Sequence, residues 1–308
     1  MREKILFVSF LFFMINASAQ QDPQYTQYMY NMSVVNPAYA TGAQSMLDVG
    51  ILYRTQWVGA VGAPKKMTLF GHMPVNNKVE LGFSLISDDI GDGAKKENNF
   101  SADFAYVLQF NNNHRLSLGL KAGLTSMQTN FNGFKFESTS PDFAFEDIDF
   151  LKPNIGVGAY YFTDDYYVGL SAPNLLNSKH IEKRSGISDY GSENIHAFFT
   201  GGYVFTLSDS FKLKPAFMSK FVKGAPVTLD LSANVLYNEK FEFGASYRFD
   251  DAVSALMNIK VTPGVRVGYA YDYTISNLGQ FNSGTHEIFV LFNLDLLGKG
   301  YDKSPRFF

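Results

Sequence analysis

The chain has 308 residues, of which 16% are aromatic and 18% are charged, and its formal net charge is −3. This acidic balance excludes a general nucleic-acid binder, which needs a basic surface. The chain has no cysteine, which excludes a disulfide framework, a thiolate metal site, a cysteine nucleophile and a lipoprotein anchor. The mean hydropathy of −0.08 is too polar for a bundle of membrane-spanning helices.

Residues 1–19 predict a secretory signal peptide. Arg2 and Lys4 form a basic region, an apolar run follows from Ile5 to Met14, and residues 17–19 (ASA) match an A-x-A cleavage site. The apolar run is too short for a spanning helix. We therefore expect cleavage after Ala19, with a retained N-terminal anchor as the alternative.

Residues 20–46 form a polar segment that is rich in Tyr, Gln and Asn and has no sustained period. Two interpretations stay open: a linker that threads to the first strand, and a plug or periplasmic docking element. A pure linker has no need of so many aromatic residues, and tyrosines can stack while their hydroxyls stay hydrogen-bonded. The candidate partner-binding residues in this segment are Tyr25, Tyr28, Tyr30, Asn36, Pro37 and Tyr39.

From residue 47 to residue 296, apolar and polar residues alternate with period two, which predicts β-strands. The alternating stretches run about ten residues, the length of a tilted strand that crosses a membrane. We predict about fourteen strands. They cover residues 47–57, 65–74, 79–87, 98–109, 114–126, 152–162, 165–173, 194–206, 210–221, 226–237, 240–248, 251–261, 264–274 and 284–296.

The connections between these strands alternate in length. Those after even-numbered strands are short, whereas the long ones, at residues 87–98, 127–151, 173–193 and 275–283, all follow odd-numbered strands. We therefore predict an all-β fold, a single transmembrane antiparallel β-barrel with short periplasmic turns, long extracellular loops and a periplasmic tail at residues 297–308. An even strand number also places both chain ends in the periplasm. A soluble β-sandwich or β-propeller is the alternative, but the apolar face of a sandwich points inward, and no repeat of about 40–50 residues indicates a propeller.

Charged residues of both signs fall on the predicted lumen face. Charges in a narrow lumen must pair, because an unpaired charge away from water is costly. We interpret them as a structural network that fills the interior, since mixed signs form no selectivity ring; a selective solute channel is the alternative. The residues are Arg54, Lys121, Asp230, Glu242, Arg248, Arg266, Asp272 and Glu287.

Other features predict no chemistry. The connection at residues 127–151 is acidic and rich in Phe, and it adds Phe143 and Phe145 as partner-binding candidates. The five histidines show no metal-ligand spacing. For a hydrolase, the one local candidate pair is His286 with Ser283, which is a weak signal. We assign no catalytic, metal or cofactor-binding residue and expect no cofactor.

Several segments resemble the PorP/SprF family of Bacteroidetes outer-membrane proteins, which belongs to the type IX secretion system. The N-terminal segment, residues 20–31 (QQDPQYTQYMYN) followed by residues 35–40 (VNPAYA), is the most specific of them. Residues 53–59 (YRTQWVG), 167–176 (YVGLSAPNLL) and 268–272 (GYAYD) follow in family order. Thr41 is a departure, because the family pattern has glycine directly after Ala40.

The resemblance implies a non-enzymatic outer-membrane component that supports secretion and surface anchoring of cargo with a type IX C-terminal sorting domain, such as gliding adhesins. It also implies contact with periplasmic secretion or peptidoglycan-linked components and with outer-membrane lipid. A porin or solute transporter is the alternative function.

Overall fold

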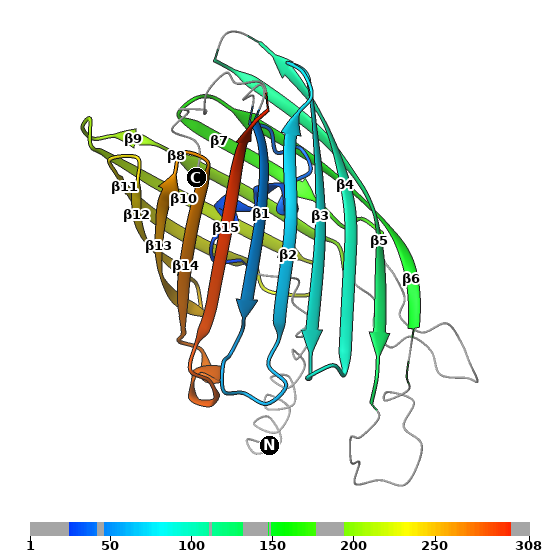
Figure 1. Cartoon of the computed structure of the whole chain (residues 1–308). Helices are drawn as coiled ribbons and strands as arrows, with labels where there is room; N and C mark the ends of the chain where they lie inside the picture. The colour runs from blue at the N-terminus through cyan, green and yellow to red at the C-terminus, as the bar shows by residue number, and fades with distance from the viewer. Residues whose placement is uncertain are drawn as a thin grey trace, which may run out of the picture.

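The computed structural model describes residues 25–41, 46–110, 113–131, 147, 149–176 and 194–296. Their strands form one closed antiparallel barrel of 14 strands, with β8 and β9 together making one interrupted strand (Figure 1). The strands are β1 (Met46–Thr55), β2 (Lys65–Pro74), β3 (Val79–Ile90), β4 (Lys95–Gln109), β5 (Arg115–Thr129), β6 (Asp149–Phe162), β7 (Tyr166–Ala172), β8 (His196–Tyr203), β9 (Phe205–Thr206), β10 (Phe211–Val222), β11 (Thr228–Tyr237), β12 (Phe241–Arg248), β13 (Ala252–Thr262), β14 (Val265–Thr274) and β15 (Thr285–Asp295).

Each strand pairs with its neighbours in the chain, and β15 pairs with β1 to close the ring. The predicted all-β barrel is thus confirmed. One prediction about its connections is wrong, because β3 and β4 extend past their predicted ends and only residues 91–94 join them. Gly91, Asp92 and Gly93 have φ of 73°, 50° and 97°, and this left-handed backbone makes the tight turn.

A proline accounts for the break between β8 and β9. The β10 pairing joins Ala216 to Gly202 and Leu213 to Phe205, so Pro215 lies opposite the interruption. Proline has no N–H to donate to a sheet. On the opposite side of the strand, the N–H of Val204 donates to the carbonyl of Asp165 at 2.8 Å, which continues the register of the β7–β8 pairing. The wall therefore stays continuous although one ladder bond is missing.

The two faces of the wall differ in polarity. On β5, Leu118 and Leu120 point outward and are 48% and 61% exposed, whereas Ser117 and Lys121 point inward and are buried. Aromatic pairs lie outside near the strand ends, such as Tyr166–Tyr203 and Phe211–Tyr237 at the short-turn end and Tyr247–Phe249 at the long-connection end. An apolar band between aromatic girdles is the lipid-facing surface of a membrane barrel.

In the described residues, three short helical turns accompany the sheet. They are η1 (Tyr28–Tyr30), α2 (Met32–Val35) and η3 (Asn277–Phe281). In the ranges that the structure describes, no helix is long and apolar enough to cross a membrane. The first two turns belong to residues 25–41, which run inside the ring of strands.

Candidate functional site

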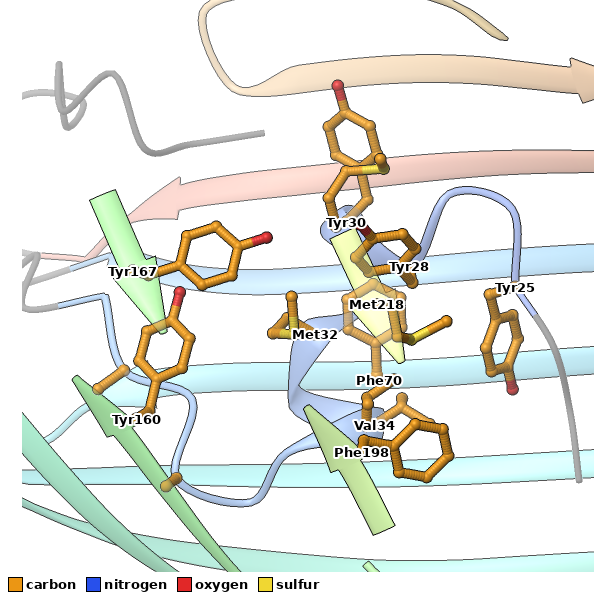
Figure 2. Close-up of a cluster of buried hydrophobic side chains, with 14 of the residues drawn as sticks. Tyr25, Tyr28, Tyr30, Met32, Val34, Phe70, Tyr160, Tyr167, Phe198 and Met218 are labelled. Carbon is orange, nitrogen blue, oxygen red and sulfur yellow. The ribbon is translucent and has the colours of Figure 1, made fainter. Parts of the chain in front are cut away.

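The N-terminal segment 25–41 lies in the barrel lumen, where it forms the core of the molecule. Its aromatic, Met and Val side chains meet inward-pointing residues of the wall (Figure 2). Tyr28, for example, is only 1% exposed. The wall contributes Phe70, Tyr160, Tyr167, Phe198 and Met218 to this cluster. The segment has short turns and no long element, so its place is set by contacts with the wall rather than by its own secondary structure.

The segment crosses the lumen from one end to the other. Tyr25 bonds to Thr68 at 2.8 Å, in the half of β2 nearer the long connections. Thr41 donates its backbone N–H to Glu80 at 2.9 Å, at the short-turn end of β3. The even strand number does place the start of β1 at the short-turn end. However, the chain reaches it from the opposite end of the lumen, which the strand count could not indicate.

An ion cluster holds the first residues of the segment. Arg54 pairs with Asp272 at 2.9 Å and with Glu287 at 3.0 Å. The hydroxyl of Thr26 donates to Asp272 at 2.7 Å, and the backbone N–H groups of Thr26 and Gln27 donate to Glu287 at 3.1 and 2.8 Å. All five residues are buried. Charge-assisted hydrogen bonds in such a site are stronger than neutral ones, so the cluster anchors the segment.

Tyr30 makes the second attachment. Its hydroxyl donates to Glu242 and accepts from the side chain of Asn258 at 2.9 Å. Arg266 pairs with Glu242 at 3.2 Å, and the Tyr30 ring stacks on Phe289 with 4.4 Å between centroids.

Glycines of the wall make room for the turn at Asn36. The side chain of Asn36 accepts from the N–H of Ala38 at 2.9 Å. A Cβ on Gly158 would lie 2.1 Å from Asn36 Oδ1, and one on Gly119 would lie 2.3 Å from the backbone N of Ala38. A Cβ on Gly169 would lie 2.9 Å from Asn36 Nδ2. Neighbouring strands β5, β6 and β7 therefore form a notch that only glycine leaves open.

All eight charged residues predicted for the lumen are buried. Besides the groups above, Lys121 pairs with Asp103 at 3.0 Å, and Arg248 pairs with Asp230 at 2.8 Å. Sequence reasoning missed further buried charged or ionisable groups on the wall, although each occupies an inward position in the alternation of its strand and could have been found that way. They include Lys66, His72, Glu80, Asp103, His196, Lys214 and Lys220.

The remaining predicted partner-binding residues are in the N-terminal segment and in the connection at residues 127–151. Tyr39 packs near His72 and Tyr160, with ring centroids 5.2 and 5.5 Å apart. The N-terminal candidates thus make their contacts with the barrel wall. Phe143 and Phe145 lie outside the described residues.

The weak hydrolase candidate gains no support from geometry. His286 contacts the Tyr269 hydroxyl through Nδ1 at 2.7 Å, and in the described part of the chain no hydrogen bond joins it to Ser283. Among the described residues, no group of three or more His, Asp or Glu side chains could hold a metal ion.

A closed barrel with an apolar outer face, aromatic girdles and a buried polar lumen defines an outer-membrane β-barrel protein. The family can be stated as well: a family model described as "Type IX secretion system membrane protein PorP/SprF" matches residues 17–292. The chain therefore belongs to the PorP/SprF family. No curated protein matches the sequence.

Several solved structures are similar to this chain but distant in sequence. A TodX deltaS2S3 mutant, a monoaromatic hydrocarbon channel, is 10% identical with a TM-score of 0.51, covering 86% of this chain and 94% of that one. A FadL homologue from Pseudomonas aeruginosa is 11% identical with a TM-score of 0.49, covering 91% and 96%. Omp33 of Acinetobacter baumannii is 10% identical with a TM-score of 0.48, covering 82% and 100%. The likeness to the TodX channel shows a shared barrel fold and nothing further.

Proposed function

We propose that this type IX secretion component supports the secretion and surface anchoring of cargo that carries a C-terminal sorting domain, such as gliding adhesins. The secreted C-terminal domain would bind at the long-connection end of the barrel. Periplasmic secretion or peptidoglycan-linked components would bind at the short-turn end. Cleavage after Ala19 would release the mature chain for assembly in the outer membrane.

The observation that carries this proposal is the occupied lumen. Residues 25–41 run through it and are attached to the wall by the carboxylates of Glu80, Glu242, Asp272 and Glu287. A solute pore needs an open path, and the groups that line it must be free to bind the ion or solute one after another. Here the lumen charges are paired with each other and with the segment. This favours a role for the outer surface of the barrel over the porin alternative.

The test is deletion of the gene in its native organism, followed by proteomics of the cell surface. Surface display of specific proteins with C-terminal sorting domains should be lost and should return with the wild-type gene. Tagged protein purified from native membranes should carry those same proteins. A complemented strain with both Phe143→Ser and Phe145→Ser should show reduced display if that connection faces the cargo.

Control measurements separate this role from a general defect. Cargo of other secretion routes and the abundance of other outer-membrane barrels should be unchanged by the deletion. If all sorting-domain proteins stay on the surface and none co-purifies, the proposed role is excluded.

A further inference from the structure

The barrel wall has an incomplete seam between β6 and β7. Residues 149–162 of β6 all pair with β5. On its other side, β6 pairs with β7 only over residues 157–162. The reason is that β7 has only seven residues and ends at Ala172. Among the described residues, the part of β6 nearest the long connections therefore has a strand partner on one side only.

The chain that follows β7 covers the part of this seam next to β7, at residues 154 and 155 of β6. The N–H of Leu175 donates to the carbonyl of Ile155 at 2.8 Å, and the Asn154 side chain donates to the carbonyl of Pro173 at 3.2 Å. Backbone groups of successive strand residues point to opposite sides. Since Ile155 points to the β7 side, Asp149, Leu151 and Pro153 do so too. In the described part of the chain, no backbone N–H or C=O is hydrogen-bonded to these three residues on that side.

The sequence of β6 suits an edge at this point. Proline within a sheet is confined to edges and bulges, because it lacks the N–H of the ladder. The backbone N–H that Pro153 lacks would point to the open side, so no hydrogen bond to β5 is lost. The outward side chains there are apolar: Leu151 is 65% exposed. What remains on the open side is the N–H of Asp149 and Leu151 and the carbonyls of all three residues.

We propose that this edge, residues 149–153 of β6, binds an extended segment of the exported partner by β-strand addition. Free backbone donors and acceptors in a row are complementary to another extended strand. The incoming segment would place apolar side chains beside Leu151 on the outer face. It would place polar or small side chains beside Lys152 and Asn154, which point to the lumen side. The inference rests on the proposed function, which supplies the partner.

A second copy of this chain fits the edge less well. Two barrels in one membrane with the same orientation are related by an axis along the membrane normal, which would set two β6 edges parallel. Parallel pairing is less stable per residue than antiparallel pairing, and both edges would carry Pro153. A free partner segment can approach in the antiparallel direction.

The experiment uses the full-length protein in detergent and, as the probe, the C-terminal domain of a secreted protein whose surface display depends on this barrel. Amide hydrogen exchange is followed in the fragment that covers residues 149–153. Exchange there should be fast in the free protein, compared with β11, which is paired on both sides. It should slow at least about tenfold when the domain is bound, because a buried bonded amide exchanges only on opening.

A proline substitution tests the direction of the bond. Leu151→Pro removes an N–H that points to the open side and leaves the β5 ladder intact. An unsatisfied partner carbonyl should then weaken binding of the domain by about tenfold or more. Leu151→Ala keeps the N–H and is the matched control, with binding close to that of wild type. Heat-modifiable mobility of each variant verifies the folded barrel.

The outcomes separate the two proposals. Protection of residues 149–153 together with weaker binding by Leu151→Pro supports strand addition at this edge. Binding without protection, or equal binding by wild type and Leu151→Pro, overturns the edge proposal and leaves the proposed function standing. If the domain does not bind the wild-type protein at all, both proposals fail. The exchange measurement needs no variant, so it decides even if Leu151→Pro does not fold.

Discussion

The backbone N–H of Gln27 donates to the carboxylate of Glu287 at 2.8 Å, across 260 positions of the chain. Glu287 lies opposite Arg54 in the β1–β15 pairing that closes the barrel, and it pairs with that guanidinium at 3.0 Å. The carboxylate of Glu287 thus stabilises both the β1–β15 pairing that closes the barrel and the position of the N-terminal segment in the lumen. Closure of the wall and occupation of the lumen are therefore coupled.

Glu287→Gln should lower the free energy of unfolding by about 3 kcal/mol, because it leaves a buried guanidinium with one fewer anionic partner. Urea unfolding in lipid vesicles, followed by the fluorescence of the single tryptophan, Trp57, measures the change. Asp164→Asn is the control: Asp164 also pairs with an arginine, at 2.7 Å, but it is exposed. That variant should lose at most about 1 kcal/mol. Equal losses would contradict the anchoring role of Glu287.

Deletion of residues 25–41 should open the lumen to ions. In planar bilayers, the wild-type protein should pass little current, whereas the deletion variant should show discrete conductance steps, because the segment is removed from the path. Heat-modifiable mobility on gels verifies that the shortened chain still forms a barrel. Currents of the same size in both proteins would mean that the segment does not occlude the barrel, and would favour the porin alternative.

Gly158→Ala should destabilise the protein by about 1 to 3 kcal/mol, since its Cβ would lie 2.1 Å from Asn36 Oδ1. Asn36→Ala in the same chain removes that oxygen, so the double variant should lose less than the sum of the two single variants. The coupling, read from unfolding curves, should exceed about 0.5 kcal/mol. At Gly82 the nearest atom would lie 3.3 Å away, so Gly82→Ala should have a smaller effect. Strictly additive losses would argue against the notch.

Leu120→Arg should destabilise the barrel by about 2 to 4 kcal/mol if its outward face lies in lipid. Val61 offers a matched control, because it is fully exposed in the connection between β1 and β2. Val61→Arg should change stability by no more than about 0.5 kcal/mol. Vesicle-embedded protein unfolded in urea measures both variants. A cost at Val61 as large as at Leu120 would contradict the assigned lipid face.

Much of the wall was predictable from sequence. The alternation of Leu118 and Leu120 with Ser117 and Lys121 reports directly on lipid and lumen faces, since adjacent strand residues point to opposite sides. The strand between residues 65 and 74 was predicted with the ends that β2 has. The ends of β3 and β4 were missed because Asp88 and Lys96 are polar residues within the paired region. Polarity alone does not tell a strand end from a loop.

The path of residues 25–41 was not predictable, and their short turns explain why. A segment without a hydrophobic period carries no local signal of where it goes, and both a linker and a plug were consistent with its tyrosines. Its position depends on contacts such as Thr26 with Asp272 and Tyr30 with Glu242, which join residues more than two hundred positions apart. The role of Gly158 likewise exists only once Asn36 is placed against it.

The sequence by itself determined the all-β barrel and the sign and side of its lumen charges, because period-two alternation is a local property of the chain. The tertiary structure alone decided which charges meet, that the N-terminal segment crosses the lumen, and which part of β6 pairs on one side only among the described residues. These depend on how the ring of strands closes. Closure brings β15 against β1 and sets a short β7 beside a long β6, and no local pattern encodes either meeting.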